Sequence, residues 1–492
     1  MPEGRAPGRR GRRGRWVAAA ALVLVVGLAG VAAGRWWWER EHQGQAMQIP
    51  DTHGPRPAEL PQTRPATQAR GEGPFVARVS DDGRYFEDED GRPILVRGDS
   101  PWSLLVDVAP ADAEAYLDDR AGHGVNAIIV SLLGARVNGG PSDDGATADG
   151  VLPFVGGDVL RWQPEYWDRA HQVLAAAADR GITVFLYPVD GWTVGHAFVP
   201  AALDECRAYG ERVATWAADL PNVMWMTGGD YFPATDDLAA GSDVDHCFAQ
   251  VRAGLRAVGD QRPFSIQLGY PRSVSTENPF WAGKVDFNFV YTYQPTSVAV
   301  RQAYDHRPAL PALLGEANYE RENNDGGPPT TNETLRRQVA WALTSGAAGD
   351  FYGSDDWEFL DGWSSRLDTP GLRQVGVVRD VIEALPWWRL DPVAGDSLVV
   401  SGRGSASAGS GDVLQSDVLT AAATADGRYA VVYVPTAREI GLDTGALAAG
   451  SSARWVDPAT GAKQAVGLRA HLRTPGRNAD GGEDWLLVVA PG

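Results

Sequence analysis

Two acidic residues, Asp230 and Glu316, each stand at the end of a short apolar run. Asp230 closes the segment 221–230 (PNVMWMTGGD), in which two glycines let the chain turn after the apolar run. Glu316 closes the segment 312–316 (ALLGE). An isolated Gly-Gly-Asp is more often a turn whose acid caps the backbone. A second run ending in a carboxylate favours a pair of acids that face each other. Hydrolysis of a glycosidic bond uses such a pair: one group protonates the leaving oxygen, and the other attacks the anomeric carbon or activates water.

The elements that would position these acids alternate along the chain. Eight strand-like runs, with amphipathic helical segments between and after them, predict an α/β fold in the form of a (β/α)8 TIM barrel over residues 75–392. Asp230 then ends the fourth strand and Glu316 the seventh, so both face the same mouth. The predicted strands are 94–98, 127–131, 183–188, 223–226, 264–268, 287–291, 312–314 and 350–352, and the predicted helices include 110–123, 164–180, 201–218, 242–258, 333–345 and 369–385.

Four other strand ends carry polar or aromatic residues. Sugars are bound by carboxylates and amides that hydrogen-bond their hydroxyls, and by aromatic faces that cover their C–H surfaces. Any single tryptophan is more often core or rim packing, but recurrence at four strand ends predicts a carbohydrate site at the mouth. The residues predicted to bind substrate are Asp99 and Trp102 after the first strand, Asp190 and Trp192 after the third, Tyr291 and Gln294 after the sixth, and Asp355 and Trp357 after the eighth.

Five motifs give this segment a resemblance to a known family. They are RGDSPW at 97–102, YLDDR at 116–120, GVN at 124–126, GGD at 228–230 and LGE at 314–316. Together they resemble the apiosidase-like family of glycoside hydrolases. The resemblance implies a glycosidase that retains the anomeric configuration, with the residue at the end of the fourth strand (Asp230) as acid/base and the residue at the end of the seventh (Glu316) as nucleophile. It also suggests a branched or furanose sugar, in plant or cell-envelope polysaccharide, as substrate.

Retention sets an expected distance between the two acids. Carboxyl groups about 5 to 5.5 Å apart allow direct attack, whereas about 6.5 to 9.5 Å leaves room for a water molecule and inversion. We expect the shorter distance. Two other classes stay open: a glycan-binding or adhesion protein on an inactive barrel, and a surface peptidase or esterase. The last ranks lowest because the sequence contains no GxSxG or HExxH motif.

The N-terminal segment predicts a membrane anchor. Six arginines lie among the first fifteen residues, and residues 16–34 carry no charge. Nineteen helical residues span about 28 Å, close to a bilayer core, and the arginines would hold residues 1–15 in the cytoplasm. Residues 35–74 are predicted to be a flexible linker that leaves the barrel outside the cell. The alternative is a signal peptide cleaved after Ala33, which would release a secreted protein.

Charge and cysteine content exclude several partners. The net charge of −19 makes the chain a poor partner for nucleic acid. The two cysteines, Cys206 and Cys247, are too few for a zinc site, and the sequence contains no phosphate-loop or dinucleotide motif, so we predict no metal and no cofactor. Outside the cell the two cysteines could pair, since neighbouring barrel helices would carry them.

The chain from 393 to 492 has a different pattern. Short alternating strands at 397–400, 429–435, 453–457 and 485–489, with turns between them and no helix, predict a small β-sandwich. It resembles the C-terminal module, named for collagen binding, that often follows such barrels. Because nothing in its residues specifies collagen, we expect it to pack on the barrel or to lie near the carbohydrate.

Overall fold

A computed structural model describes residues 74–200, 202–270, 272–322, 329–406 and 413–492. The predicted cytoplasmic tail, the membrane anchor and all but the last residue of the predicted linker therefore lie outside the described residues. Within the described ranges, none of the helices is both long enough and apolar enough to cross a membrane.

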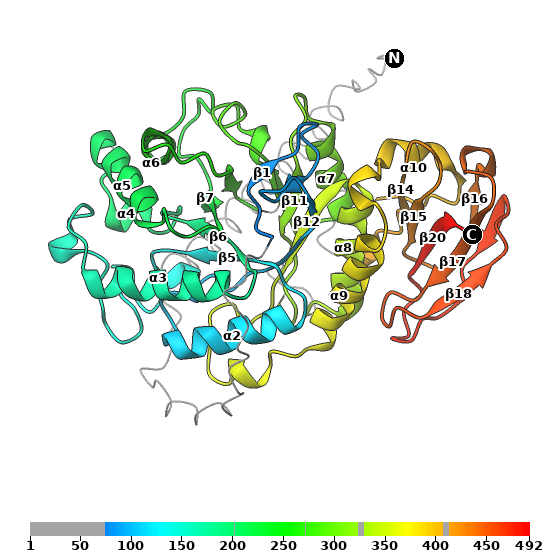
Figure 1. Ribbon diagram of the computed structural model, residues 1–492, viewed down its shortest axis with the longest axis horizontal. Coiled ribbons are helices and arrows are strands. Elements are labelled where there is room, and N and C mark those ends of the chain that lie inside the picture. Colours follow the sequence, from blue (N-terminus) through cyan, green and yellow to red (C-terminus); the bar gives the residue numbers. More distant parts are fainter. Residues whose placement is uncertain (1–73, 201, 271, 323–328, 407–412) are drawn as a thin grey trace, which may run out of the picture. The chain divides into compact units, whose positions relative to one another are not determined.

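Eight parallel strands form the centre of the fold (Figure 1). All eight predicted strands are present, although β4 begins at Val96 because Ile94 belongs to a separate hairpin strand, and β7 continues five residues beyond the predicted end at Met226. The result is a barrel-like sheet whose strands all point toward one mouth. In chain order the strands are β4 (Val96–Asp99), β5 (Ala127–Ser131), β6 (Thr183–Tyr187), β7 (Val223–Tyr231), β8 (Phe264–Leu268), β10 (Asn288–Thr292), β11 (Ala312–Glu316) and β12 (Ala347–Tyr352).

Serine side chains help to close the barrel between β8 and β10. The sheet ends at β8 on one side and, on the other, at β9 (Arg272–Val274), which pairs antiparallel with β10. Ser265 Oγ donates to the carbonyl of Phe287 at 2.6 Å, and Ser275 Oγ donates to that of Ile266 at 2.7 Å. These bonds satisfy backbone groups that a regular ladder would otherwise pair.

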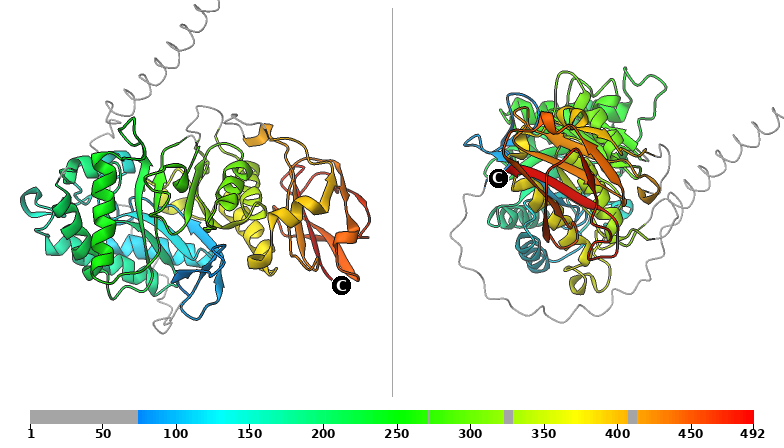
Figure 2. Two further views of the ribbon diagram at one scale, coloured as in Figure 1. Left: turned by 90° about the horizontal axis from the view of Figure 1, so that it is seen from above. Right: turned by 90° about the vertical axis from the view of Figure 1, so that its right-hand side faces the viewer.

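Helices surround the strands (Figure 2), and their ends follow sequence signals. Proline occupies the first turn of α2, α3 and α9, where its missing N–H costs nothing. Ser242 accepts from Asp245 N and thereby caps α6. The helices are α2 (Pro110–Gly122), α3 (Pro164–Ala178), α4 (Val194–Ala197), α5 (Leu203–Trp216), α6 (Asp243–Ala257), α7 (Thr296–Asp305), α8 (Asn332–Thr344) and α9 (Pro370–Glu383).

A small antiparallel sheet lies at the amino ends of the barrel strands. It consists of β1 (Arg78–Val79), β2 (Phe86–Glu87) and β3 (Pro93–Ile94), with a turn at Asp82–Gly83 between the first two. The ring of Phe86 meets that of Phe287, just before β10, at 5.3 Å. The barrel interior above it is filled mainly by large apolar side chains such as Phe185, Met224 and Phe351.

The C-terminal part is built from two antiparallel sheets that share a core. The four predicted strands are present, but the expectation of no helix is wrong, because α10 (Pro392–Leu398) takes in Ser397, the first residue of the predicted strand 397–400. Four further short strands were missed. The sheets comprise β13 (Val399–Ser401), β16 (Glu439–Leu442) and β19 (His471–Arg473), and β14 (Thr420–Ala423), β15 (Ala430–Val434), β20 (Trp485–Pro491), β17 (Ser451–Val456) and β18 (Lys463–Val466).

These sheets are joined to the barrel by buried contacts from α8. One apolar cluster contains both Trp341 of α8 and Tyr433 of β15. Arg336, which is fully buried, pairs with Asp484 at 2.9 Å and with Asp480 at 2.7 Å. Such a shared core favours a fixed arrangement of barrel and sheets over a loosely tethered module.

Candidate active site

The end of β7 is a bulge that sets the position of Asp230. Gly228, Gly229 and Asp230 all have positive φ, at 95°, 72° and 49°, and the pairing with β8 shifts register between Thr227 and Tyr231. A Cβ on Gly228 would collide with the carbonyl oxygen of Gln267, so this turn requires glycine. The glycine pair thus lets the strand bring a carboxyl to the barrel mouth.

Glu316 ends β11 in a buried position with a defined donor. Only 8% of the residue is exposed. Gln267 Nε2 donates to Glu316 Oε2 at 2.6 Å, and Tyr187 OH donates to Gln267 Oε1 at 2.8 Å. Since Tyr187 supplies a donor to the amide oxygen, the amide nitrogen is left facing the carboxyl.

Asp230 and Glu316 influence each other, and Tyr291 lies near both. Burial raises the pKa of Asp230 to about 6, and the nearby hydroxyl of Tyr291 acts in the opposite direction. Burial also raises the pKa of Glu316 well above its usual value, with the charge of Asp230 as the next cause, while Gln267 and Tyr291 oppose this rise. The hydroxyl of Tyr291 donates to Tyr293 OH at 2.7 Å, and burial together with the charges of Asp230 and Glu316 raises the pKa of Tyr291, so this tyrosine lies close to both acids.

Neither acid is neutralised by a basic side chain within the described ranges. Asp230 is half-buried, and its Oδ1 is shielded from solvent without a hydrogen-bond partner among the described residues. A buried polar atom without a partner is costly. Such an atom at the mouth of a barrel is suited to meet a ligand.

Two of the predicted sugar-binding residues, Trp102 and Trp192, lie beside this pair. Trp102 Nε1 donates to Tyr319 OH at 2.9 Å, and its ring meets that of Trp192 at 5.8 Å. A Cβ on Gly229 would touch the half-buried ring of Trp192. Trp192 therefore lies directly against the residue that precedes Asp230.

Asp99 and Asp190, by contrast, are used inside the fold. Asp99 is buried and paired with Arg120, and it accepts from Tyr116 OH at 2.5 Å. Asp190 is buried and accepts from Ser131 Oγ at 2.8 Å and from Thr193 N at 2.8 Å. Their acceptor positions are occupied by protein donors, which hold the loops at these strand ends, and their binding of substrate stays a prediction.

The remaining predicted residues occupy the rim. Asp355 forms an ion pair with Arg321, and Gln294 is half-buried with its backbone N–H bonded to Thr292 Oγ1 at 3.0 Å. Trp357 Nε1 donates to Glu322 Oε1 at 2.7 Å. The charge of Glu322 is one of the causes that raise the pKa of Glu316, which places the loop of Trp357 near the two acids.

Sequence reasoning missed Tyr187, Gln267 and Tyr319. A usable signal existed for the first two, because both lie inside predicted strands. Tyr187 is two residues from the inward-facing Phe185 and so shares its face of β6. Gln267 is the one amide inside the apolar run 264–268, and a buried amide must find partners. Tyr319 follows β11 in a loop, where no periodicity applies.

The two cysteines form a disulfide with an S–S distance of 2.06 Å, which settles the pairing that the sequence left open. It joins α5, which precedes β7, to α6, which follows it. The loop that it closes contains Asp230. Among the described residues, no group of three or more His, Cys, Asp or Glu side chains is placed to hold a metal ion.

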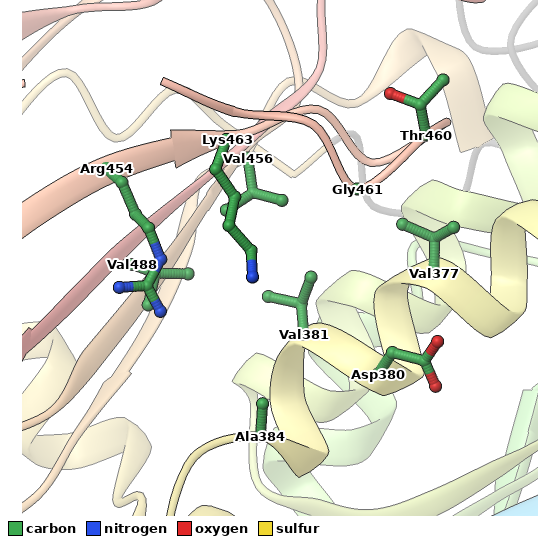
Figure 3. A pocket seen from close by; sticks show the side chains of 10 residues that line it. All are labelled: Val377, Asp380, Val381, Ala384, Arg454, Val456, Thr460, Gly461, Lys463 and Val488. Carbon is green, nitrogen blue, oxygen red and sulfur yellow. The ribbon is translucent and has the colours of Figure 1, made fainter. Parts of the chain in front are cut away.

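A separate hollow of about 190 Å³ lies between α9 and the strands β17, β18 and β20 (Figure 3). Lys463 reaches from β18 toward Val381 of α9. Asp380, on its wall, pairs with Arg97 of β4 at 2.8 Å, and the lining comes from α9 and the C-terminal strands, with no residue from the strand ends at the barrel mouth. It contains no facing pair of carboxyls and is therefore distinct from the site of Asp230 and Glu316.

Two family models match this chain. The model described as "Apiosidase-like, catalytic domain" matches residues 80–389, and the one described as "Putative collagen-binding domain of a collagenase" matches residues 410–490. No curated protein matches the chain by sequence.

Solved structures share the fold over most of the chain. A protein titled "Glycoside hydrolase" superposes with a TM-score of 0.71 at 19% identity, over 85% of this chain and 97% of its own. A glycoside hydrolase family 5 protein from Bacteroides vulgatus ATCC 8482 gives the same TM-score, identity and coverage of this chain, with 94% of its own length covered. At this identity the likeness establishes a glycoside hydrolase fold.

Proposed function

Because this chain belongs to the apiosidase-like family, we propose that it hydrolyses glycosidic bonds with retention of configuration, using Asp230 as acid/base and Glu316 as nucleophile. One observation carries the proposal: two acids end the fourth and seventh barrel strands, and the charge of Asp230 contributes to the raised pKa of Glu316. Retention requires the two carboxyl groups to lie about 5 to 5.5 Å apart, so that Glu316 attacks directly rather than through an intervening water.

In the first step Glu316 attacks the anomeric carbon while Asp230 gives its proton to the leaving oxygen. The bond to the leaving group breaks as the bond to Glu316 forms, which gives a glycosyl-enzyme and a free alcohol. Asp230, now ionised, then accepts a proton from water, whose oxygen displaces Glu316 from the anomeric carbon. Both residues return to their starting states, and the configuration is retained by two inversions.

The position of the shared proton needs an argument from geometry. Burial raises the pKa of both acids, and the charge of Asp230 adds to the rise at Glu316, which by itself would leave the proton on Glu316. However, Glu316 receives the amide donor of Gln267, which favours its ionised form. Asp230 Oδ1 has no donor among the described residues and suits a proton directed at a leaving group. We therefore place the proton on Asp230 when substrate is bound.

The substrate and the location are further parts of the proposal. The family name favours a branched or furanose sugar, and the apolar segment 16–34 after an arginine cluster favours an anchored enzyme with its barrel outside the cell. A mature N-terminus just after Ala33 would instead mean secretion. Strong preference for glucopyranosides or xylopyranosides would contradict the furanose assignment.

A glycan-binding role on an inactive barrel is less well supported. Binding alone does not require a half-buried acid whose charge raises the pKa of a buried one, an arrangement that costs stability. The cost is understandable where the acids perform chemistry.

The test is a panel of aryl furanosides and pyranosides, assayed with wild type and with Glu316→Gln. We expect wild type to cleave at least one member and the variant to cleave none, while its circular dichroism stays unchanged. Proton NMR of the earliest product should show the substrate's own anomeric configuration. An inverted product would refute the nucleophile assignment, and equal activity of the variant would refute the site.

A further inference from the structure

A row of four aromatic rings leads from the two acids to the protein surface. Tyr291 meets Tyr293 at 5.3 Å between ring centroids, Tyr293 meets Tyr270 at 6.0 Å, and Tyr270 meets Phe232 at 6.3 Å. These residues come from the ends of β10, β8 and β7. The row starts at Tyr291, which lies beside the two acids, since burial and then the charges of Asp230 and Glu316 raise its pKa.

The outer end of this row is unusually exposed. Phe232 is 51% exposed, and within the described ranges Trp388 is the other markedly exposed Phe or Trp, at 40%. The ring of Phe232 lies against Gly269, where a Cβ would collide with it. Glycine at that position therefore allows the ring to rest on the backbone, with part of its surface left to water.

An exposed ring connected to a reactive site is suited to stack on a sugar. The weakly polar C–H face of a sugar ring covers an aromatic face, while its hydroxyls stay solvated. Phe232 follows Asp230 by two residues on the same strand end. The proposed acid/base is the group that meets the leaving oxygen, so Phe232 lies on the leaving-group side of the scissile bond.

We propose that Phe232 and Tyr270 form a binding subsite for a sugar residue on the leaving-group side of the bond. This inference rests on the proposed function and extends it: the natural substrate carries a saccharide, rather than a small alcohol, as its leaving group. The enzyme thus removes a sugar that is attached to another sugar, as in an oligosaccharide or a branched polysaccharide.

The experiment uses two substrates with the glycone that the aryl panel identifies. One is a disaccharide, and the other is the glycosyl fluoride, whose leaving group cannot stack. For Phe232→Ala we expect kcat/KM to fall about three- to tenfold on the disaccharide, mainly through KM, and less than about twofold on the fluoride. Phe232→Tyr should restore most of the loss, and Trp388→Ala, which removes the other exposed ring, should match wild type on both.

Equal losses on the two substrates would show a structural role for Phe232, and no loss on the disaccharide would show that no sugar stacks there. Either result would overturn the subsite. Calorimetric titration of the disaccharide into Glu316→Gln, with and without Phe232→Ala, tests the same point without turnover. If Glu316→Gln hydrolyses the fluoride normally, the catalytic proposal fails independently of the subsite.

Discussion

Gln267 donates a 2.6 Å hydrogen bond from Nε2 to Oε2 of Glu316, and its own Oε1 is occupied by Tyr187. Both supporting side chains are fully buried. An amide nitrogen can only donate, so this contact stabilises the charged form of Glu316 and fixes its orientation. Gln267 acts through Glu316 and is a positioning residue.

We expect Gln267→Met, which keeps the side-chain length but removes the donor, to lower kcat by about ten- to a hundredfold with little change in KM. Loss of the donor also raises the pKa of Glu316, so the acidic limb of the pH–rate profile should move to higher pH. Tyr187→Phe should shift the acidic limb less, because the amide of Gln267 remains to donate to Glu316. A lower rate with an unmoved acidic limb would indicate that Gln267 serves packing alone.

Asp230→Ala should show the pattern of a lost acid/base. The first step then lacks its proton donor, so kcat/KM should fall by about a hundredfold or more on substrates with poor leaving groups and least on activated aryl glycosides. Azide should restore turnover with activated substrates, because it attacks the glycosyl-enzyme without needing a base, and should give a glycosyl azide of retained configuration. Rescue of Glu316→Ala with the same configuration would reverse our assignment of the two acids.

The raised pKa of Asp230 predicts a pH-dependent cost to stability. Its pKa rises from 3.8 unfolded to about 6 folded, so the folded state binds more protons between these values. The contribution of Asp230 to the free energy of unfolding is therefore fully present below about pH 4 and is lost as the pH rises through about 6. A shift of one pKa unit corresponds to about 1.36 kcal/mol of unfolding free energy. Because Asp230 is partly exposed, solvent reduces this effect, and we expect a loss of about 2 kcal/mol.

Asp230→Asn should consequently be more stable than wild type by about 2 kcal/mol at pH 8 and equally stable at pH 4. Urea unfolding at the two pH values measures this difference. Asp236→Asn, at an exposed position on the same loop, serves as the control and should follow wild type at both. A variant less stable than wild type at pH 8 would contradict the burial argument.

The pairing of Asp99 with Arg120 predicts a structural phenotype. Removing one partner leaves a buried charge without compensation, so Asp99→Ala should lose about 3 to 5 kcal/mol of unfolding free energy. KM for any surviving folded enzyme should stay near the wild-type value. Asp355→Ala, which removes a more exposed partner of Arg321, should cost about 1 kcal/mol or less. If Asp99→Ala instead raises KM without lowering the unfolding free energy, Asp99 binds substrate.

The barrel could be predicted because each strand is a short apolar run with clear boundaries. The C-terminal strands β14, β16, β18 and β19 were missed because they are only three or four residues long, too short for an alternation to show. Closure between β8 and β10 also could not be predicted. It depends on Ser265 and Ser275, whose hydroxyls have no periodic signature.

At the site, the sequence indicated which strand ends carry acids but not what each acid faces. Asp99, Asp190 and Asp230 look alike as acids at strand ends. Only the fold shows that Asp99 is paired with Arg120 and that Asp190 accepts a hydrogen bond from Ser131. One oxygen of Asp230, by contrast, has no donor among the described residues. Local spacing specifies position along a strand, and partners across the barrel come from residues far away in sequence.

The disulfide between Cys206 and Cys247 predicts a coupling between stability and the site. It spans 41 residues, for which the chain-entropy relation gives about 4 kcal/mol. Replacing both cysteines with alanine should lower the unfolding free energy by about 2 to 4 kcal/mol and leave activity at 25 °C within about twofold. Reductant should lower the melting temperature of wild type to that of the double variant and leave the variant unchanged, since the chain has no other cysteine. Because the closed loop contains β7 and Asp230, we expect reduced wild type to lose activity on warming before its C-terminal sheets unfold. Tryptic cleavage between residues 206 and 247 would report this local opening of the loop. Simultaneous loss of activity and of the sheets would mean that the disulfide stabilises the whole barrel rather than the segment that carries Asp230.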